Sequence, residues 1–145
     1  MTKAIFTGSF DPFTVGHASI VQRALPLFDS IVIAVGHNEH KKGMFSVEER
    51  VERIEKHYAN EPKIEVVAYS DLTVDVAKRV GANVIIKGIR SFKDFEYERQ
   101  QAEINKTIGG IETLFLCSDP QYESISSSIV RELIHFGRDV SGMMI

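Results

Sequence analysis

The feature that most constrains the fold is an alternation of short apolar runs with longer segments of helical period. The runs are rich in β-branched residues and mostly continuous, as expected for parallel strands that are covered on both faces. They comprise Ala4–Phe6, Ile31–Val35, Ile64–Ala68, Val84–Ile86 and Thr113–Leu116. Five strands, each followed by a helix, predict right-handed crossovers and one open, doubly wound, five-stranded parallel α/β sheet with helices on both faces. The pattern does not predict the order of the strands.

Helical segments lie between these runs, and capping residues mark several of their ends. The expected helices span about Thr14–Phe28, Ser46–Tyr58, Thr73–Val80, Ser91–Thr107 and a last segment that starts among Ser126–Ser128 and ends before Gly137. Ser46 and Glu49 have the spacing of a capping box, and Gly81 suits the residue that follows a helix. Pro26 conflicts with the first helix and is expected to kink it or end it early.

Length and composition exclude several classes of protein. The chain has 145 residues, of which 43% are hydrophobic and 26% charged, which predicts a single domain spanning residues 1–145. Its net charge of −3 argues against a nucleic-acid partner, because such proteins usually need surplus cations. The single cysteine, Cys117, allows no internal disulfide, and no apolar run approaches the ~20 residues of a membrane span. With no signal-peptide pattern at its start, the chain is expected to be soluble and cytoplasmic, with no membrane partner.

Glycines, cations, hydroxyls and a histidine follow the strands at one edge of the predicted sheet. In open α/β sheets, ligands bind beyond the carboxyl ends of the strands, where the strand order reverses. The expected loops at that edge are 7–17, 36–43, 70–73, 87–91 and 122–128. The connectors at the opposite edge look like ordinary solvated turns. We therefore expect the ligand site at the first edge.

The first of these loops opens a helix with Thr14, Gly16 and His17. Thr14 suits an N-cap, and His17 would sit in the first turn, where free N–H groups and the helix dipole attract anions. An imidazole N–H there could donate to a phosphate oxygen. A lone histidine at a helix start is more often a packing residue, but Gly8, Ser9 and Gly16 in the same loop favour a phosphate site.

Two further loops carry cations. Lys87 and Arg90 flank Gly88 at a strand end, where a guanidinium offers phosphate a planar fork and an ammonium offers a point charge. Lys41 and Lys42 could swing over a bound polyphosphate or remain a solvated pair. Surface cations are common at strand ends, so neither signal decides the function alone.

Three serines, Ser126–Ser128, start the last helix. They are either an N-cap with more hydroxyls than capping needs, or an anion site made of hydroxyls and unpaired N–H groups. Arg131 lies on the same face of the helix. Asp94, Glu96 and Glu98 are typical of an ordinary acidic helix surface. No P-loop, Gly-x-Gly-x-x-Gly motif, serine nucleophile elbow or Cys/His metal pattern is present.

The candidate residues include many donors to phosphate oxygens but no nucleophile–base pair. That set favours transfer of a nucleotidyl or phosphoryl group by positioning and charge stabilisation, without a covalent enzyme intermediate. A phosphomonoester acceptor would need no general base, because its second pKa lies near ~6 and it is largely a dianion at neutral pH.

Two motifs resemble those of the nucleotidyltransferase superfamily. Thr14–His17 matches (His/Thr)-x-Gly-His, and Ile125–Arg131 matches Ile-Ser-Ser-(Ser/Thr)-x-x-(Arg/Lys). These motifs alone would also admit nicotinate-nucleotide adenylyltransferases and cytidylyltransferases. Further stretches narrow the resemblance, along essentially the whole chain, to the bacterial phosphopantetheine adenylyltransferases: residues 8–12, 41–45, 70–72, and 87–90 followed by 94–98.

The resemblance implies a Rossmann-like nucleotidyltransferase fold and a reversible reaction. ATP and 4′-phosphopantetheine would give dephospho-coenzyme A and pyrophosphate, the penultimate step of coenzyme A synthesis, with Mg²⁺ accompanying the ATP phosphates. It also implies a homohexamer and feedback inhibition by coenzyme A. Two alternatives stay open: an adenylyltransferase acting on nicotinate mononucleotide, and a non-catalytic nucleotide sensor on the same scaffold.

The resemblance further implies a role for each matching residue. His17 would stabilise the transition state at the α-phosphate, with Ser9 and Phe10 at the junction of the two substrates. Phosphopantetheine would be held by Ser9, Lys41, Thr73 and Lys87. ATP would be held by Ser9, Phe10, His17, Gly88, Ile89, Arg90, Glu98, Tyr122, Glu123, Ser124, Ile125, Ser126, Ser127 and Ser128. Lys87 stands where many members carry arginine, which keeps the charge but loses the bidentate fork.

Overall fold

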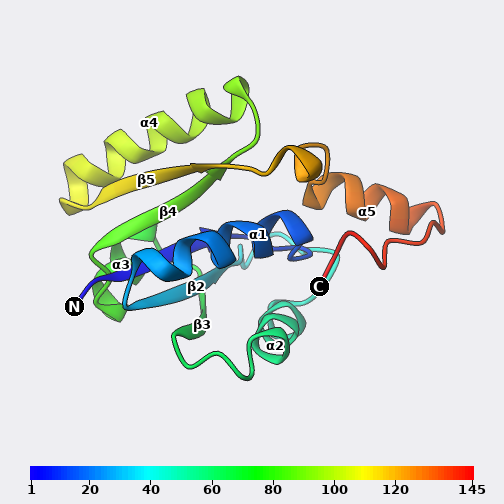
Figure 1. Cartoon of the computed structure of the whole chain (residues 1–145), viewed down its shortest axis with the longest axis horizontal. Helices are drawn as coiled ribbons and strands as arrows, with labels where there is room; N and C mark the ends of the chain where they lie inside the picture. Colours follow the sequence, from blue (N-terminus) through cyan, green and yellow to red (C-terminus); the bar gives the residue numbers. More distant parts are fainter.

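Five parallel strands form one sheet, and the first strand lies at its centre (Figure 1). The computed structural model describes residues 1–145. The strands are β1 (Lys3–Gly8), β2 (Ser30–Gly36), β3 (Ile64–Tyr69), β4 (Val84–Ile89) and β5 (Glu112–Cys117), in the order β3-β2-β1-β4-β5. Every neighbouring pair is parallel, which confirms the predicted sheet. The strand order reverses between β1 and β4, which is where sheets of this kind form a crevice.

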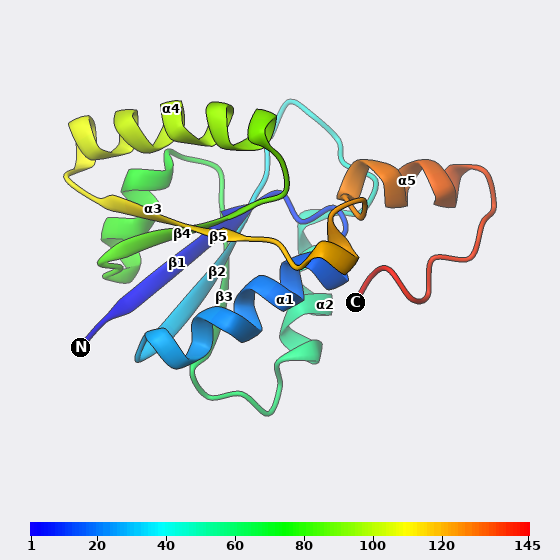
Figure 2. The same ribbon diagram turned by 45° about the horizontal axis from the view of Figure 1, so that its top comes forward.

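Helices cover both faces of the sheet, as predicted (Figure 2). They are α1 (Val15–Ala24), α2 (Val47–His57), α3 (Thr73–Val80), α4 (Phe92–Gly109) and α5 (Ser127–His135), with short 3₁₀ turns η1 (Leu25–Leu27) and η2 (Pro120–Tyr122). Ile20 of α1 and Ile54 of α2 pack on one face, and Val76 of α3 packs on the other. No helix is both long and apolar enough to cross a membrane.

The central strands have apolar side chains on both faces, which explains their continuous apolar runs. In β1, Ala4 and Phe6 join the core beneath α1 and α2, while Ile5 joins the core beneath α3. The edge strands β3 and β5 are only partly covered, and Leu114 of β5 is 48% exposed. Burial is therefore deepest at β1 and β2, next to the reversal in strand order.

Several predicted helix boundaries are confirmed because their signals are local. Ser46 caps α2 by accepting a hydrogen bond from the Glu49 N–H at 3.2 Å. The helix α3 spans the predicted residues and ends before Gly81, whose φ of +74° is the left-handed conformation that glycine adopts without strain. The start of α5 lies within the predicted serines, with Ser126 as its N-cap.

Other boundaries differ from the predicted segments. The first helix stops short of Phe28, as Pro26 predicts: α1 ends at Ala24 and a 3₁₀ turn follows, because Pro26 cannot continue the α-helical hydrogen bonds. Strands β1 and β4 run past the predicted ends, so Gly8 and Lys87 lie within strands. Strand pairing uses backbone groups, so it continues through glycine and lysine after the apolar run has stopped.

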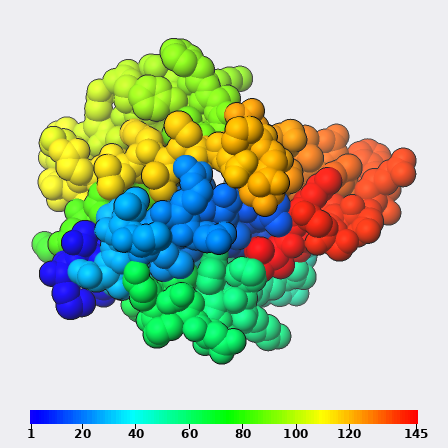
Figure 3. Space-filling view, in the orientation of Figure 1, coloured from blue at the N-terminus to red at the C-terminus, as the bar shows by residue number.

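The helix α5 lies beyond the carboxyl ends of the strands, and the chain then returns to the start of α1 (Figure 1). The Val15 N–H donates to the Met143 carbonyl, and the Ile145 N–H donates to the Phe13 carbonyl. Figure 3 shows this C-terminal end, in red, against the blue start of α1. The segment 140–145 therefore braces the turn from which α1 begins.

Replacing Ile54 by alanine is expected to lower the free energy of unfolding by about 2–5 kcal/mol, because it leaves a cavity beneath α2. Ile54 has no exposed surface. Urea denaturation followed by circular dichroism measures the change. The matched variant Leu27→Ala removes an aliphatic side chain that is 60% exposed, so it should cost no more than about 0.5 kcal/mol. Equal losses in the two variants would contradict this placement of the core.

Candidate active site

A cleft of about 320 Å³ opens at the carboxyl ends of β1 and β4, where the strand order reverses. Its walls come from the β1–α1 loop, the end of β4, the first turns of α4 and the start of α5. Only 5 of its 21 lining residues are hydrophobic, so the cleft suits a charged ligand better than an apolar one. Its volume falls at the lower end of the ~300–1,000 Å³ range of small-molecule pockets.

Most of the predicted site residues line this cleft. They are Ser9, Phe10, His17, Lys87, Gly88, Arg90, Glu98, Tyr122, Ile125, Ser126, Ser127 and Ser128. Lys41 lines a neighbouring hollow instead, and Thr73 begins α3 outside the cleft. Ile89, Glu123 and Ser124 do not line it either. Their roles stay predictions.

The cleft also contains residues that were not expected there. Ser118 follows β5, and its hydroxyl donates to the Ile89 carbonyl at 3.0 Å. Nothing in the sequence singles it out, because Ser118 lies before the motif that starts at Ile125. Ile20 supplies an apolar wall from α1. Asp94, interpreted from sequence as solvated surface, lines the cleft and accepts a hydrogen bond from the Arg90 Nε at 3.1 Å.

His17 forms a reciprocal capping box with Thr14. The Thr14 hydroxyl accepts from the His17 N–H at 3.3 Å, and the Thr14 N–H donates to His17 Nδ1 at 2.9 Å. Since Nδ1 accepts a hydrogen bond, the proton of a neutral ring must lie on Nε2. The cap therefore fixes both the orientation of the imidazole and its tautomer.

The surroundings of His17 keep its ring uncharged. Its imidazole packs against the rings of Phe10 and Phe13, with centroids 4.9 and 5.3 Å away. Burial, and after it the charges of Arg90 and Lys87, together lower the pKa of His17 to about 3. At neutral pH, His17 is thus a fixed N–H donor and not a cation.

Lys87 and Arg90 each face a carboxylate from α4. The Lys87 ammonium donates to the Thr7 carbonyl at 3.2 Å and lies 3.7 Å from Glu98. Burial lowers the pKa of Lys87, and Glu98 partly offsets that effect. Both ion pairs are partly exposed, and such pairs contribute little to stability. An incoming phosphate can therefore replace the carboxylates as partner of either cation.

The start of α5 is tied to the β1–α1 loop. The Ser127 hydroxyl donates to the Pro12 carbonyl at 2.7 Å. Arg131 donates to the Asp11 carbonyl at 2.8 Å and to the Ser128 hydroxyl at 3.2 Å, as expected from their shared helix face. The free N–H groups of this helix start therefore face a loop whose position is set by hydrogen bonds, which suits an anion site.

Two further hollows extend the cleft along the strand ends. A hollow of about 340 Å³ shares Gly8 and Ser9 with the cleft and reaches Tyr69. A third, of about 380 Å³, shares His37 with the second and reaches Lys41. The three hollows therefore lie in a row from α5 to the loop after β2, and Ser9 lines both the first and the second.

No group of three or more His, Cys, Asp or Glu side chains is close enough together to hold a metal ion. The acidic residues of the cleft, Asp94 and Glu98, instead face Arg90 and Lys87. A metal ion in this cleft would therefore need phosphate oxygens among its ligands.

The chain is similar to known proteins in sequence and in structure. Residues 5–133 match the cytidylyltransferase-like family. The chain is 53% identical over 141 residues to a phosphopantetheine adenylyltransferase of Porphyromonas gingivalis, covering 97% of this chain and 92% of that one. It is 50% identical over 141 residues to a protein of the same name from Bacteroides fragilis, covering 97% and 94%.

The fold is also found in a bifunctional NMN adenylyltransferase/ADP ribose pyrophosphatase from Francisella tularensis, whose crystal structure contains AMP and a manganese ion. The TM-score is 0.72 at 17% identity, over 99% of this chain and 44% of that one. At this identity the likeness concerns the fold alone.

The His17 ring is expected to remain neutral, with its proton on Nε2, from about pH 5 to pH 8, because its pKa is about 3. Nitrogen-15 NMR of the imidazole measures this directly, and urea-unfolded protein serves as the control, since a free imidazole titrates near ~6.5. The unfolded ring binds a proton between those two pKa values and the folded ring does not. This group therefore makes the free energy of unfolding rise with pH across that window. A folded-state midpoint near 6.5 would contradict the assignment.

Proposed function

The chain belongs to the phosphopantetheine adenylyltransferases of the cytidylyltransferase-like family, and from that membership we propose that its cleft transfers the adenylyl group of ATP to 4′-phosphopantetheine. The products are dephospho-coenzyme A and pyrophosphate, so the reaction serves coenzyme A synthesis. One observation carries the proposal for the site: His17, Lys87, Arg90 and the start of α5 line one cleft, and Ser9 lines both this cleft and the neighbouring hollow.

ATP occupies the cleft between β4, α4 and α5. Within the stretches Gly88–Arg90 and Tyr122–Ser128, the residues that line the cleft hold the nucleotide together with Glu98, and the start of α5 receives its phosphates. Support comes from the free N–H groups of α5 and from the Arg90 guanidinium, because both are strong donors to phosphate oxygens.

Phosphopantetheine lies toward the other end of this row of hollows, the end near Lys41. Its phosphate lies against Lys87, and its long arm follows the second hollow toward the loop that carries Lys41. Thr73 begins α3 two residues after Asp71, which lines that hollow. Ser9 lies at the junction of the two substrates, which suits a reaction in which both phosphates meet.

The transfer is a direct displacement. An oxygen of the acceptor phosphate forms a bond to the α-phosphorus of ATP while the bond to the pyrophosphate oxygen breaks, so no enzyme nucleophile is needed. The Nε2–H of His17 donates to a non-bridging α-phosphate oxygen, where negative charge develops in the transition state. Because its pKa is about 3, His17 is a neutral imidazole that transfers no proton, and its contribution is a hydrogen bond from its remaining N–H.

A divalent ion, Mg²⁺, arrives with the phosphates of ATP as part of the substrate. Bound there, it neutralises charge on the leaving pyrophosphate. The protein contributes the cations Lys87 and Arg90 and the α5 N-terminus.

Pyrophosphate release from ATP tests the proposal. Release is expected with 4′-phosphopantetheine and not with nicotinate mononucleotide, each supplied with Mg²⁺. Release with nicotinate mononucleotide alone would place the chain with the neighbouring adenylyltransferases. Calorimetric binding of ATP, with no binding of phosphopantetheine and no release, would instead indicate a nucleotide sensor.

The His17→Ala variant is expected to lose about 10²–10³-fold in kcat, the usual cost of removing one donor to a developing oxyanion. Its Kd for ATP should stay within about threefold of the wild-type value, since most ATP contacts lie on other elements. Steady-state kinetics and calorimetry measure the two quantities. The control is His57→Ala, an exposed histidine at the end of α2. Retained turnover in His17→Ala would remove this residue from the mechanism.

We also propose a homohexamer. No residue of α4 is buried, and its Phe92 and Ile108 are 83% and 56% exposed. Together with the exposed Leu114 of β5, these side chains offer an apolar surface to other copies of the chain. Sedimentation should give six times the chain mass of 16.3 kDa, and a monomer would overturn the proposal. Feedback inhibition by coenzyme A and a cytoplasmic location stay predictions from the family.

A further inference from the structure

Arg50 is a buried guanidinium without a carboxylate partner. It lies on α2, is 6% exposed and takes part in none of the salt bridges of the molecule. Its acceptors are three carbonyls: Nη1 donates to Ser9 at 2.7 Å and to Gly36 at 3.1 Å, and Nε donates to Phe45 at 3.1 Å. An apolar side chain of similar size would avoid the desolvation cost of the charge. What Arg50 supplies at this position is therefore its set of hydrogen bonds.

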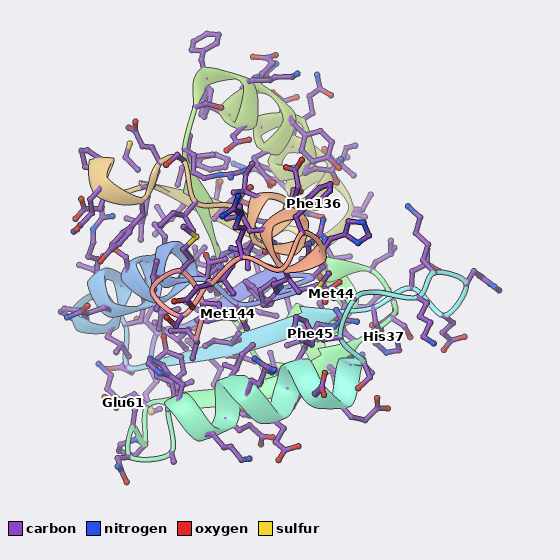
Figure 4. The ribbon with its side chains drawn as sticks, turned by 90° about the vertical axis from the view of Figure 1, so that its right-hand side faces the viewer. His37, Met44, Phe45, Glu61, Phe136 and Met144 are labelled. Carbon is purple, nitrogen blue, oxygen red and sulfur yellow. The ribbon has the colours of Figure 1, made fainter.

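Asp11 is the second buried charge of this region, at 7% exposure. Its carboxylate accepts from the Met44 N–H at 2.8 Å and from the Phe45 N–H at 2.9 Å. Gly43 permits this approach, because a Cβ there would lie 2.6 Å from Asp11 Oδ2. Figure 4 shows the loop between His37 and Met44 standing out from the body and returning at Met44 and Phe45. Asp11 therefore anchors the end of the loop that carries Lys41.

The backbone of Phe45 joins the two charges. Its N–H donates to the Asp11 carboxylate, and its carbonyl accepts from Arg50. Because these two groups belong to the peptides on either side of the Phe45 Cα, the two hydrogen bonds fix the backbone of Phe45 from both sides. We call this arrangement of Asp11, Phe45 and Arg50 the Asp11–Arg50 clamp. It ties the β1–α1 loop to the end of β2, to the Lys41 loop and to α2.

We propose that the Asp11–Arg50 clamp positions the two substrates for adenylyl transfer. The inference rests on the proposed function of the cleft, and it adds residues that do not line that cleft. On one side the clamp holds Ser9, where the two substrates meet. On the other side it holds the returning end of the loop that bears Lys41. One set of hydrogen bonds thus sets the distance between Ser9, where the two phosphates react, and the Lys41 loop, toward which the arm of phosphopantetheine extends.

Phe10 is the residue through which the clamp reaches the reacting centre. Its φ of +48° is a left-handed conformation that is strained for phenylalanine and persists only where its neighbours hold it. Arg50 holds the carbonyl before it, and Asp11 follows it. A trans peptide points its C=O and N–H in opposite directions, so holding the Ser9 carbonyl turns the Phe10 N–H away from Arg50. That N–H makes no hydrogen bond within the protein, and Phe10 is one of the residues that line the cleft.

The decisive variant is Arg50→Met, which keeps the bulk of the side chain but removes its donors. We expect kcat to fall about 10²-fold, since misplacement of a reacting group by ~1 Å costs that much. The KM for phosphopantetheine should rise, while the Kd for ATP should stay within about threefold, because most ATP contacts lie on β4, α4 and α5. Arg50→Lys keeps one donor and the charge, so it should restore part of kcat.

The matched control is Arg53→Met. Arg53 lies on the same helix and stacks on the same Phe45, with its guanidinium carbon 4.6 Å from the ring centroid. It makes no hydrogen bond to the carbonyls that Arg50 holds. Its loss should leave kcat within about twofold of wild type.

Gly43→Ala tests the clamp from its other side and decides the question if Arg50→Met does not fold. Its new Cβ pushes against the Asp11 carboxylate, so kcat should fall about tenfold or more. Hydrogen exchange at the Met44 and Phe45 amides should accelerate, which is a readout independent of turnover. Gly142→Ala is the control, since a Cβ there meets nothing within 4 Å.

Two results would overturn the clamp: wild-type kcat and phosphopantetheine KM in both Arg50→Met and Gly43→Ala, or a parallel loss of kcat and ATP affinity that Arg50→Lys does not relieve. The second result would indicate a structural role alone. If the wild-type protein releases no pyrophosphate with phosphopantetheine, the proposed function fails. The clamp is then judged by hydrogen exchange, and unchanged rates at Met44 and Phe45 in Gly43→Ala overturn it as well.

Discussion

The pairing of β1 with β2 on one side and β4 on the other is the constraint on which the rest of the structure depends. The chain leaves β1 toward one face and enters β4 from the other, so no helix closes the gap above their carboxyl ends. The start of α1 and the start of α5 both face that gap. Backbone N–H groups thus converge on one small volume before any side chain is considered.

Burial at this convergence is the main reason why His17 is neutral, and the nearby cations Arg90 and Lys87 act in the same direction. A protonated imidazole would add a further cation beside Lys87 and Arg90 and would lose solvent. The Thr14 cap uses Nδ1, so the neutral ring has one remaining donor, Nε2. His17 can therefore stabilise the negative charge that develops in the transition state by donating a hydrogen bond, and it neither gains nor loses a proton in doing so.

Periodicity predicted the sheet and its helices because the buried central strands need apolar residues on both faces, and local caps such as Ser46 fixed several helix ends. Lys87 was placed in a loop because a cation ends the apolar run, whereas the β4–β5 pairing continues through backbone groups. Motifs predicted most of the cleft lining. The role of Arg50 could not be predicted, because its partners are backbone carbonyls. Every residue has a carbonyl, so the sequence does not show which ones a side chain contacts.

The helix α4 differs from the other elements of the site in two ways. None of its residues is buried, and the side chains that it contributes to the cleft are the carboxylates of Asp94 and Glu98. Glu98 faces Lys87 and Asp94 faces Arg90, each across a partly exposed pair. Without substrate these carboxylates satisfy two cations that would otherwise repel each other, and phosphates can displace them at small cost. The β1–α1 loop, by contrast, is fixed by buried charges. The site therefore combines a rigid reacting centre with exchangeable counter-charges, as expected for an enzyme that must bind two polyanions and release two others.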